Sequence, residues 1–153
     1  MTKKNFSLTI DDIIGAVSDY ITDSKEIEKI KDAYNYAALK HFGQKRLTGE
    51  EYIEHPLNVA YILTDINADY QTICAALLHD VIEDCNVSEE EFKEHFGEEI
   101  FTLVDGVTKI NKLNFSGDTE VMIANHRKIL VGLSKDVRVI IIKLADRLHN
   151  MRT

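Results

Sequence analysis

The chain has 153 residues, of which 44% are hydrophobic and 29% are charged, and its formal net charge is −8. This length is enough for one domain with a core of its own. One proline and seven glycines favour helices over many short strands. The acidic charge argues against a DNA-binding protein, whose contact surface would be basic. It does not argue against a phosphorylated ligand, because a bound divalent cation can be the largest local charge.

No part of the chain is expected to cross a membrane or to depend on disulfides. No apolar stretch approaches the length of a membrane-spanning helix, and no signal-peptide-like apolar run follows the basic N-terminus. Two cysteines are too few for a disulfide framework. Cys74 lies in the apolar run Ile73–Leu78 and is expected to be a buried thiol. A cytoplasmic location is therefore the default expectation.

Apolar residues at helical spacing predict a series of helices over the first two thirds of the chain. Pro56 fits the first turn of a helix, where its missing N–H costs nothing, and Ser88 with Glu91 has the spacing of a capping box. In chain order we expect a helix from Thr9 to about Ile21, one capped at Ser24 and stopped by Gly43, one beginning at His55-Pro56, one over about Asp69–Glu83, one from Ser88 to Phe96 and one over Glu98–Lys109.

The last third of the chain is harder to assign. We expect a mobile loop over Asn111–Thr119 and a helix over Glu120–Leu133. The segment Asp136–Asn150 is ambiguous, since its run of β-branched residues is typical of a buried strand. A buried helix is favoured because the apolar pattern continues at helical spacing through Leu144, Ala145 and Leu148.

The strongest chemical signal is His79-Asp80 at the end of an apolar helix, followed by Glu83-Asp84. On one continuous helix, His79 would lie above Glu83 and Asp80 above Asp84. Taken alone, this pattern is also typical of a helix end that emerges into solvent. Ionisable groups at the edge of a core must be compensated, and metal coordination is one way to do so.

Two further residues, His55 and Asp146, strengthen the metal interpretation. Each alone would more often be a helix cap or a satisfied buried polar group. Together with His79 and Asp80 they form a His/His-Asp/Asp set on three predicted helices. Imidazole plus carboxylate suits Mn²⁺ or Fe²⁺, and the lack of a thiolate argues against a structural zinc site. His41, His95, His126 and His149 are given no direct role.

The surrounding motifs resemble a known family. They are Gly43-Gln-Lys-Arg-Leu-Thr-Gly-Glu, Tyr52-Ile-Glu-His-Pro-Leu, Ala75-Ala-Leu-Leu-His-Asp-Val-Ile-Glu-Asp, Val104-Asp-Gly-Val-Thr-Lys and Ile142-Lys-Leu-Ala-Asp-Arg-Leu-His-Asn-Met-Arg-Thr. His55, His79-Asp80 and Asp146 fit the H…HD…D pattern of the HD superfamily. From about Ile10 onward, the surrounding sequence is similar to the N-terminal hydrolase domain of the bifunctional (p)ppGpp synthetase/hydrolase family.

This resemblance implies an all-α HD-superfamily helical bundle that removes the 3′-pyrophosphate of (p)ppGpp with Mn²⁺, or with Fe²⁺ or another divalent metal. It implies His55, His79, Asp80 and Asp146 as metal ligands, and Glu83 and Asp84 as the acidic pair that activates or positions the attacking water. Residues expected to contact the nucleotide are Lys45, Arg46, Thr48, Arg147, Asn150 and Thr153, with Lys45, Arg46 and Arg147 as candidate phosphate partners.

The resemblance also has departures, and alternatives stay open. Where the family often has Arg-Lys-Ser-Gly, this chain has Arg46-Leu47-Thr48-Gly49, which removes a possible contact to the base or phosphates. Family members continue past the motif that ends at Thr153, so we expect residues 1–153 to be one domain from the N-terminal part of a protein with downstream synthetase and regulatory domains. The alternatives are an HD phosphatase acting on another nucleotide such as NADPH, or a catalytically incomplete regulatory fragment.

Overall fold

A computed structural model describes residues 8–45, 49, 51–85, 87–111 and 137–152, and within these ranges the fold is helical. The described residues contain no strand, only an isolated antiparallel bridge between Lys45 and Glu51. The predicted all-α class is confirmed. No helix among the described residues is long and apolar enough to cross a membrane. The helices are α1 (Ile10–Val17), α2 (Ser24–Lys40), α3 (Glu54–Thr64), α4 (Tyr70–Leu78), α5 (Val81–Cys85), α6 (Glu89–Phe96), α7 (Glu98–Asn111) and α9 (Val137–Arg152).

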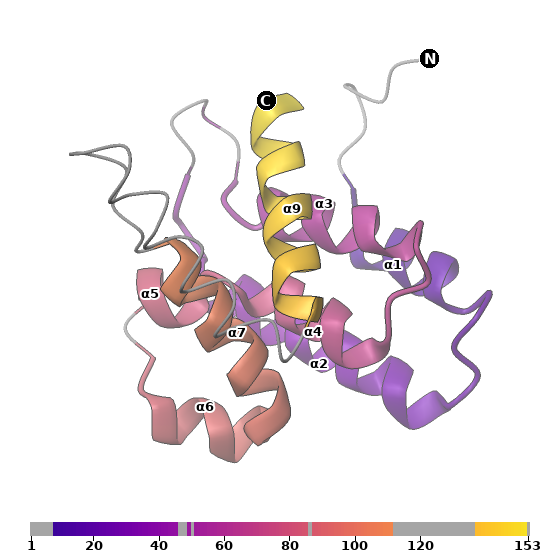
Figure 1. Cartoon of the computed structure of the whole chain (residues 1–153), viewed down its shortest axis with the longest axis horizontal. Coiled ribbons are helices and arrows are strands. Elements are labelled where there is room, and N and C mark those ends of the chain that lie inside the picture. The colour runs from indigo at the N-terminus through magenta and orange to yellow at the C-terminus, as the bar shows by residue number, and fades with distance from the viewer. Residues whose placement is uncertain (1–7, 46–48, 50, 86, 112–136, 153) are drawn as a thin grey trace.

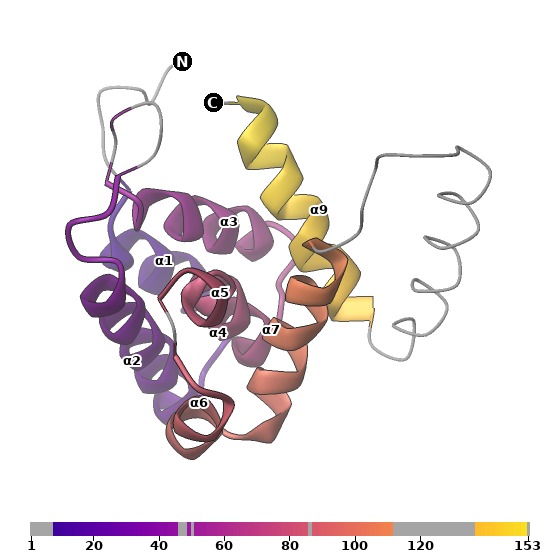
Figure 2. The ribbon, with the colours of Figure 1, turned by 90° about the vertical axis from the view of Figure 1, so that its left-hand side faces the viewer.

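Helix α4 occupies the centre of the bundle. Every residue from Thr72 to Leu78 is buried, and α2, α3, α7 and α9 all pack against this helix (Figures 1 and 2). A short helix that is apolar on all sides is stable in water only when other elements cover it. Cys74 lies in this core, and burial raises the pKa of its thiol to about 12, as expected for an inert structural cysteine. Because α4 is covered on all sides, its C-terminal end lies in the interior of the bundle.

Side-chain caps define where several helices begin. The predicted N-cap Ser24 is wrong, because Asp23 has extended backbone angles and its Oδ1 accepts from the Lys25 N–H at 2.9 Å. Ser88 does cap α6, accepting from the Glu91 N–H at 3.1 Å. Glu91 does not complete the expected capping box, since its Oε2 accepts from Tyr36 Oη at 2.6 Å instead. Helix α1 ends at Val17, earlier than predicted, although Ile21 is still buried.

The predicted helix over Asp69–Glu83 is interrupted at its most important point. α4 ends at Leu78 and α5 begins at Val81, so His79 and Asp80 form the junction. The His79 N–H approaches the Ala76 carbonyl oxygen three residues back, and His79 Nδ1 lies 2.6 Å from the same oxygen. These contacts tighten the last turn of α4 and satisfy one of its free carbonyls. The expected single helix over Asp69–Glu83 is therefore wrong.

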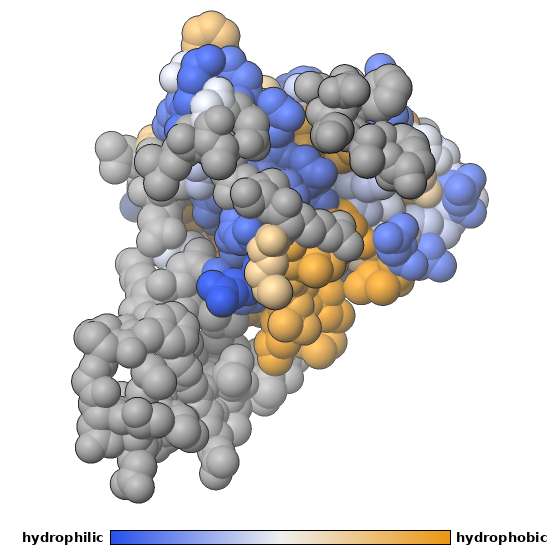
Figure 3. All heavy atoms as spheres, turned by 90° about the horizontal axis from the view of Figure 1, so that it is seen from above, coloured by the Kyte–Doolittle hydropathy of each residue, from blue (hydrophilic) through white to orange (hydrophobic). Residues whose placement is uncertain are grey.

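The ambiguous segment near the C-terminus is the predicted helix, but Leu144 and Leu148, which were expected to continue its buried face, are exposed. In α9, Val139, Ile142 and Ala145 are buried at intervals of three residues, against α3, α4 and α7. The opposite side exposes Leu144 and Met151, and hydrophobic residues gather on this part of the surface (Figure 3). The expected helix over Glu120–Leu133, and the expected loop beyond Asn111, lie outside the described residues.

Helices α7 and α9 approach closely at Gly106. A Cβ added there would lie 2.8 Å from Val139 Cγ2, which is closer than packed atoms tolerate. We expect Gly106→Ala to destabilise the fold by about 1–3 kcal/mol through overpacking, measured by urea unfolding. Val139→Ala in the same chain should recover part of this loss. Gly15→Ala is the matched control, because no heavy atom lies within 4 Å of its added Cβ. It should stabilise α1 by up to about 1 kcal/mol, and equal stabilisation by both alanines would contradict the close approach.

Candidate metal centre

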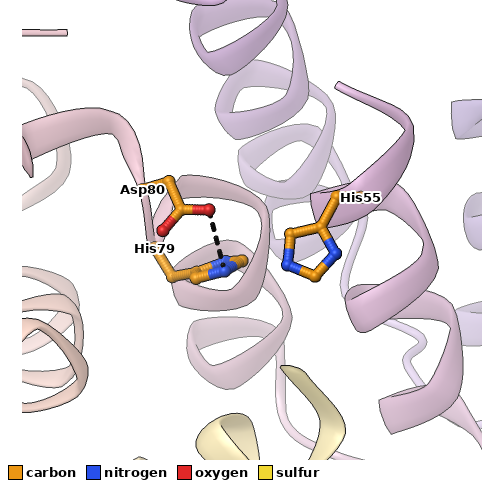
Figure 4. Close-up of side chains that lie close together, drawn as sticks. All are labelled: His55, His79 and Asp80. Carbon is orange, nitrogen blue, oxygen red and sulfur yellow. Dashed lines mark ion pairs between the residues drawn. The ribbon is translucent and has the colours of Figure 1, made fainter. Parts of the chain in front are cut away.

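Three helices bring the predicted ligand set together in the interior. His55 lies in the first turn of α3, His79 and Asp80 follow α4, and Asp146 lies in α9. The exposed fractions of the four residues are 3%, 0%, 8% and 5% in that order. Ligand atoms from His55, His79 and Asp80 all lie within 4.8 Å of one another (Figure 4). Asp146 Oδ1 closes the group, 2.6 Å from His55 Nε2 and 3.4 Å from His79 Nε2.

The position of His79 determines which of its ring nitrogens faces this group. A carbonyl oxygen only accepts, so the 2.6 Å contact with Ala76 places the proton on His79 Nδ1. In the neutral ring, Nε2 then offers its lone pair toward the carboxylates. Nε2 is buried without a hydrogen-bond partner among the described residues, although Asp80 Oδ2 lies 3.2 Å away and Asp146 Oδ1 lies 3.4 Å away. An unsatisfied buried nitrogen facing two acidic oxygens fits a metal cation.

The two carboxylates are oriented by donors from outside the group. Tyr52 Oη donates to Asp80 Oδ2 at 2.9 Å, and Lys143 Nζ donates to Asp146 Oδ2 at 2.8 Å. The Lys143 contact leaves Asp146 Oδ1 directed at the imidazoles. Partners of this kind fix the orientation of metal ligands and tune their basicity.

Without a metal, His79 and the two carboxylates shift one another's pKa values. Burial alone would lower the pKa of His79, but the charge of Asp80 and the contact with Asp146 outweigh it and hold the pKa well above 6.5. Burial would raise the pKa of Asp80, but the His79 charge and the Tyr52 hydrogen bond lower it to about 2. Asp146 behaves similarly, and contacts with His55, His79 and Lys143 hold its pKa below the usual range. In the metal-free protein, a proton on His79 therefore compensates the acids.

The structure adds residues that the sequence analysis left without a role. His149 is buried, and its Nδ1 lies 2.7 Å from His55 Nδ1. Tyr52, which holds Asp80, stacks against the buried ring of His41 at a centroid distance of 4.8 Å. Helical spacing offered a signal for His149, three residues after Asp146. The contact between Tyr52 and Asp80 joins residues 28 positions apart and had no local signal.

Of the residues expected to contact the nucleotide, Lys45, Arg147 and Asn150 lie outside this buried group. Lys45 is exposed, and its Nζ lies 3.6 Å from Glu51 Oε1. Arg147 and Asn150 are exposed on α9, one and four residues after Asp146. The remaining predicted positions fall outside the part of the chain that the structure describes: Arg46, Thr48, Thr153 and the side chains of Glu83 and Asp84.

The bundle is helical and buries two histidines and two aspartates, and one His-Asp pair is adjacent in sequence. These features are those of an HD-domain protein. The HD-domain family matches residues 33–153, which is most of the chain. The chain therefore belongs to the HD-domain family.

Two curated relatives match most of this chain in sequence. The chain is 46% identical over 143 residues to a guanosine-3′,5′-bis(diphosphate) 3′-pyrophosphohydrolase of Vibrio cholerae, covering 94% of this chain and 20% of that protein. It is 47% identical over 128 residues to the bifunctional (p)ppGpp synthase/hydrolase SpoT of Escherichia coli, covering 84% and 18%. The chain thus spans about a fifth of the length of these curated relatives.

One solved structure also matches most of this chain. It is described as a metazoan ortholog of SpoT that hydrolyzes ppGpp, and it is 32% identical to this chain with a TM-score of 0.61. The match covers 81% of this chain and 68% of the solved one. The chain is therefore similar to that solved protein in its helical fold as well as in its sequence.

Metal binding at this centre should be coupled to proton release. A cation can use His79 Nε2 only after the proton held there by Asp80 and Asp146 has left. Because the pKa of His79 is raised, the apparent Mn²⁺ affinity should rise with pH through the neutral range, by about tenfold per pH unit for each proton displaced. Calorimetric titrations in buffers of different ionisation enthalpy would measure the proton count. His95→Ala, which removes a histidine that pairs with Asp32 outside the centre, should leave the dependence unchanged. A pH-independent affinity would contradict the prediction.

Proposed function

We propose that this protein hydrolyses the 3′-pyrophosphate of ppGpp and pppGpp, giving GDP or GTP and pyrophosphate, with Mn²⁺ held by His55, His79, Asp80 and Asp146. The single observation that carries the proposal is the buried His79 Nε2, which faces Asp80 Oδ2 at 3.2 Å and Asp146 Oδ1 at 3.4 Å. The names of the relatives in Vibrio cholerae and Escherichia coli support the substrate.

The donor set favours Mn²⁺, with Fe²⁺ as the nearest substitute. Two imidazoles and two carboxylates suit a borderline-to-hard divalent ion. Among the described residues, the group that could hold an ion includes neither of the two cysteines, so the set lacks the thiolate that is typical of structural zinc. When bound, such an ion neutralises charge on the pyrophosphate and makes a nucleophile available at neutral pH.

We assign the proton transfer to the acidic pair that follows Asp80. Glu83 and Asp84 belong to α5, which begins one residue after Asp80. In the proposed mechanism, the Glu83 carboxylate takes a proton from the attacking water, while Asp84 orients it. Tyr52 and Lys143 keep Asp80 and Asp146 in place through the reaction.

We assign nucleotide binding to the rim of the centre. Arg147 and Asn150 follow Asp146 on α9, and Lys45 precedes α3 in the sequence. The net charge of the chain is −8, which would repel a substrate with several phosphates. Cationic side chains are therefore needed to bind these phosphates. Lys45, Arg46 and Arg147 are proposed as phosphate partners, and Thr48, Asn150 and Thr153 as further contacts.

The relatives also support a proposal about the whole protein. Since the chain corresponds to about a fifth of their length, we propose that residues 1–153 form one hydrolase domain of a longer cytoplasmic protein. We propose that a synthetase domain follows it, as the name of the Escherichia coli relative suggests, and that regulatory domains are also present.

Product analysis tests the proposed reaction. With Mn²⁺ and ppGpp, we expect chromatography to detect GDP and pyrophosphate in equal amounts. His79→Ala and Asp80→Ala should abolish both metal binding and turnover, because each removes a proposed ligand. His95→Ala should retain both. Release of orthophosphate from NADPH, with ppGpp left intact, would contradict the proposal and favour another nucleotide as substrate.

A second substitution separates metal binding from proton transfer. Glu83→Gln should keep Mn²⁺ affinity within a few-fold of the original chain, because the carboxylate is not a proposed ligand. Its kcat should fall by about 10²–10⁴-fold, as is typical when a general base is lost. Steady-state kinetics at saturating Mn²⁺ would measure this, and an unchanged kcat would rule out the proton-transfer role.

A further inference from the structure

We infer that His149 is a positioning residue that presents His55 to the metal through Nε2. This inference rests on the proposed metal centre and concerns how one of its ligands is held. His55 Nδ1 and His149 Nδ1 lie 2.7 Å apart, within hydrogen-bond distance. Both rings are buried, with exposed fractions of 3% and 7%, so water does not compete freely for this contact.

The hydrogen bond has only one arrangement that leaves His55 free to bind a metal. Two ring nitrogens at this distance must share one proton, since one must donate and the other accept. If His55 Nε2 offers its lone pair, the neutral ring carries its proton on Nδ1. His55 Nδ1 then donates, His149 Nδ1 accepts, and the His149 proton resides on Nε2. Without a metal, the Asp146 carboxylate accepts from His55 Nε2, so a bound cation has to displace that proton. By accepting from His55 Nδ1, His149 then supports the tautomer that binds metal through Nε2.

Helix α9 holds His55 at both ring nitrogens. Asp146 Oδ1 lies 2.6 Å from His55 Nε2, while His149 contacts Nδ1 on the other side of the ring. Asp146 and His149 are three residues apart on α9, so they share one face of that helix. The planes of the two histidine rings are inclined by 29°, with centroids 4.9 Å apart. One helix thus supplies a proposed ligand and the support for a second ligand on α3.

The same principle operates at His79 with a different acceptor. There the Ala76 carbonyl oxygen accepts from Nδ1 and leaves Nε2 for the centre. A backbone carbonyl is available at the end of α4, where the last turn has free acceptors. His55 lies in the first turn of α3, where free backbone groups are N–H donors instead. A side-chain acceptor is therefore needed, and His149 provides it.

Two substitutions at this position distinguish positioning from mere packing. His149→Ala removes the acceptor and should weaken Mn²⁺ binding by about 10–100-fold, the usual effect of losing a partner that orients a metal ligand. His149→Asn places a carbonyl oxygen near the position of Nδ1 and should restore affinity to within a few-fold. The surface variant His95→Ala controls for the loss of one imidazole. Calorimetric titration of the 153-residue chain with Mn²⁺ alone measures all four proteins, and circular dichroism monitors their folding.

The tautomer itself can be measured in the unaltered chain. With Zn²⁺ as a diamagnetic substitute, long-range ¹H–¹⁵N correlation spectra distinguish a proton on Nδ1 from one on Nε2. We expect His55 to carry its proton on Nδ1 with Nε2 bound to metal, and His149 to carry its proton on Nε2. This measurement does not depend on whether His149→Ala folds.

Each outcome bears on a definite part of the proposal. Weakened binding in His149→Ala, recovery in His149→Asn and the expected tautomers support the inference. Unchanged affinity in a folded His149→Ala protein, or metal on His55 Nδ1, would overturn the role of His149 and leave the metal centre intact. If the unaltered chain binds no metal at His55, the proposed centre fails, and the positioning role fails with it.

Discussion

Burial of two imidazoles and two carboxylates at the end of α4 is the constraint on which the rest of the structure depends. Charges in a protein interior are costly unless they are paired and hydrogen-bonded. Here His79, which is fully buried, lies within 3.4 Å of oxygens from both Asp80 and Asp146. The directions of the pKa shifts follow, since the acids hold a proton on His79 while His79 lowers the pKa of Asp80. A divalent cation can take the place of that proton.

The surrounding helices serve this arrangement by removing freedom from each group. α4 is buried along nearly its whole length, which leaves His79 a backbone acceptor on one side and the carboxylates on the other. α9 contributes Asp146, its partner Lys143 and His149, and packs against α3, α4 and α7. Tyr52 comes from the segment before α3 and reaches Asp80. Every candidate ligand therefore has a contact outside the centre that limits its rotation.

Much of this could be predicted from the sequence because it depends on local patterns. Helical spacing predicted the class of fold, and for α9 it correctly outweighed the β-branched run Val137–Ile142. The His/His-Asp/Asp pattern identified four side chains that the structure brings together. The break between α4 and α5 was missed, because it depends on the contact of His79 with Ala76 rather than on a proline or glycine. Tyr52 was also missed, since its hydrogen bond to Asp80 depends on tertiary packing.

The location of a bound Mn²⁺ tests the central claim, a metal centre between α3, α4 and α9, most directly. Crystals of the chain soaked in Mn²⁺ and measured near the manganese absorption edge would give an anomalous signal at the ion. We expect one strong peak bounded by His55 Nε2, His79 Nε2 and carboxylate oxygens of Asp80 and Asp146. A strong peak coordinated by other residues, such as the exposed glutamates Glu89 and Glu90 of α6, with none between α3, α4 and α9, would contradict this claim.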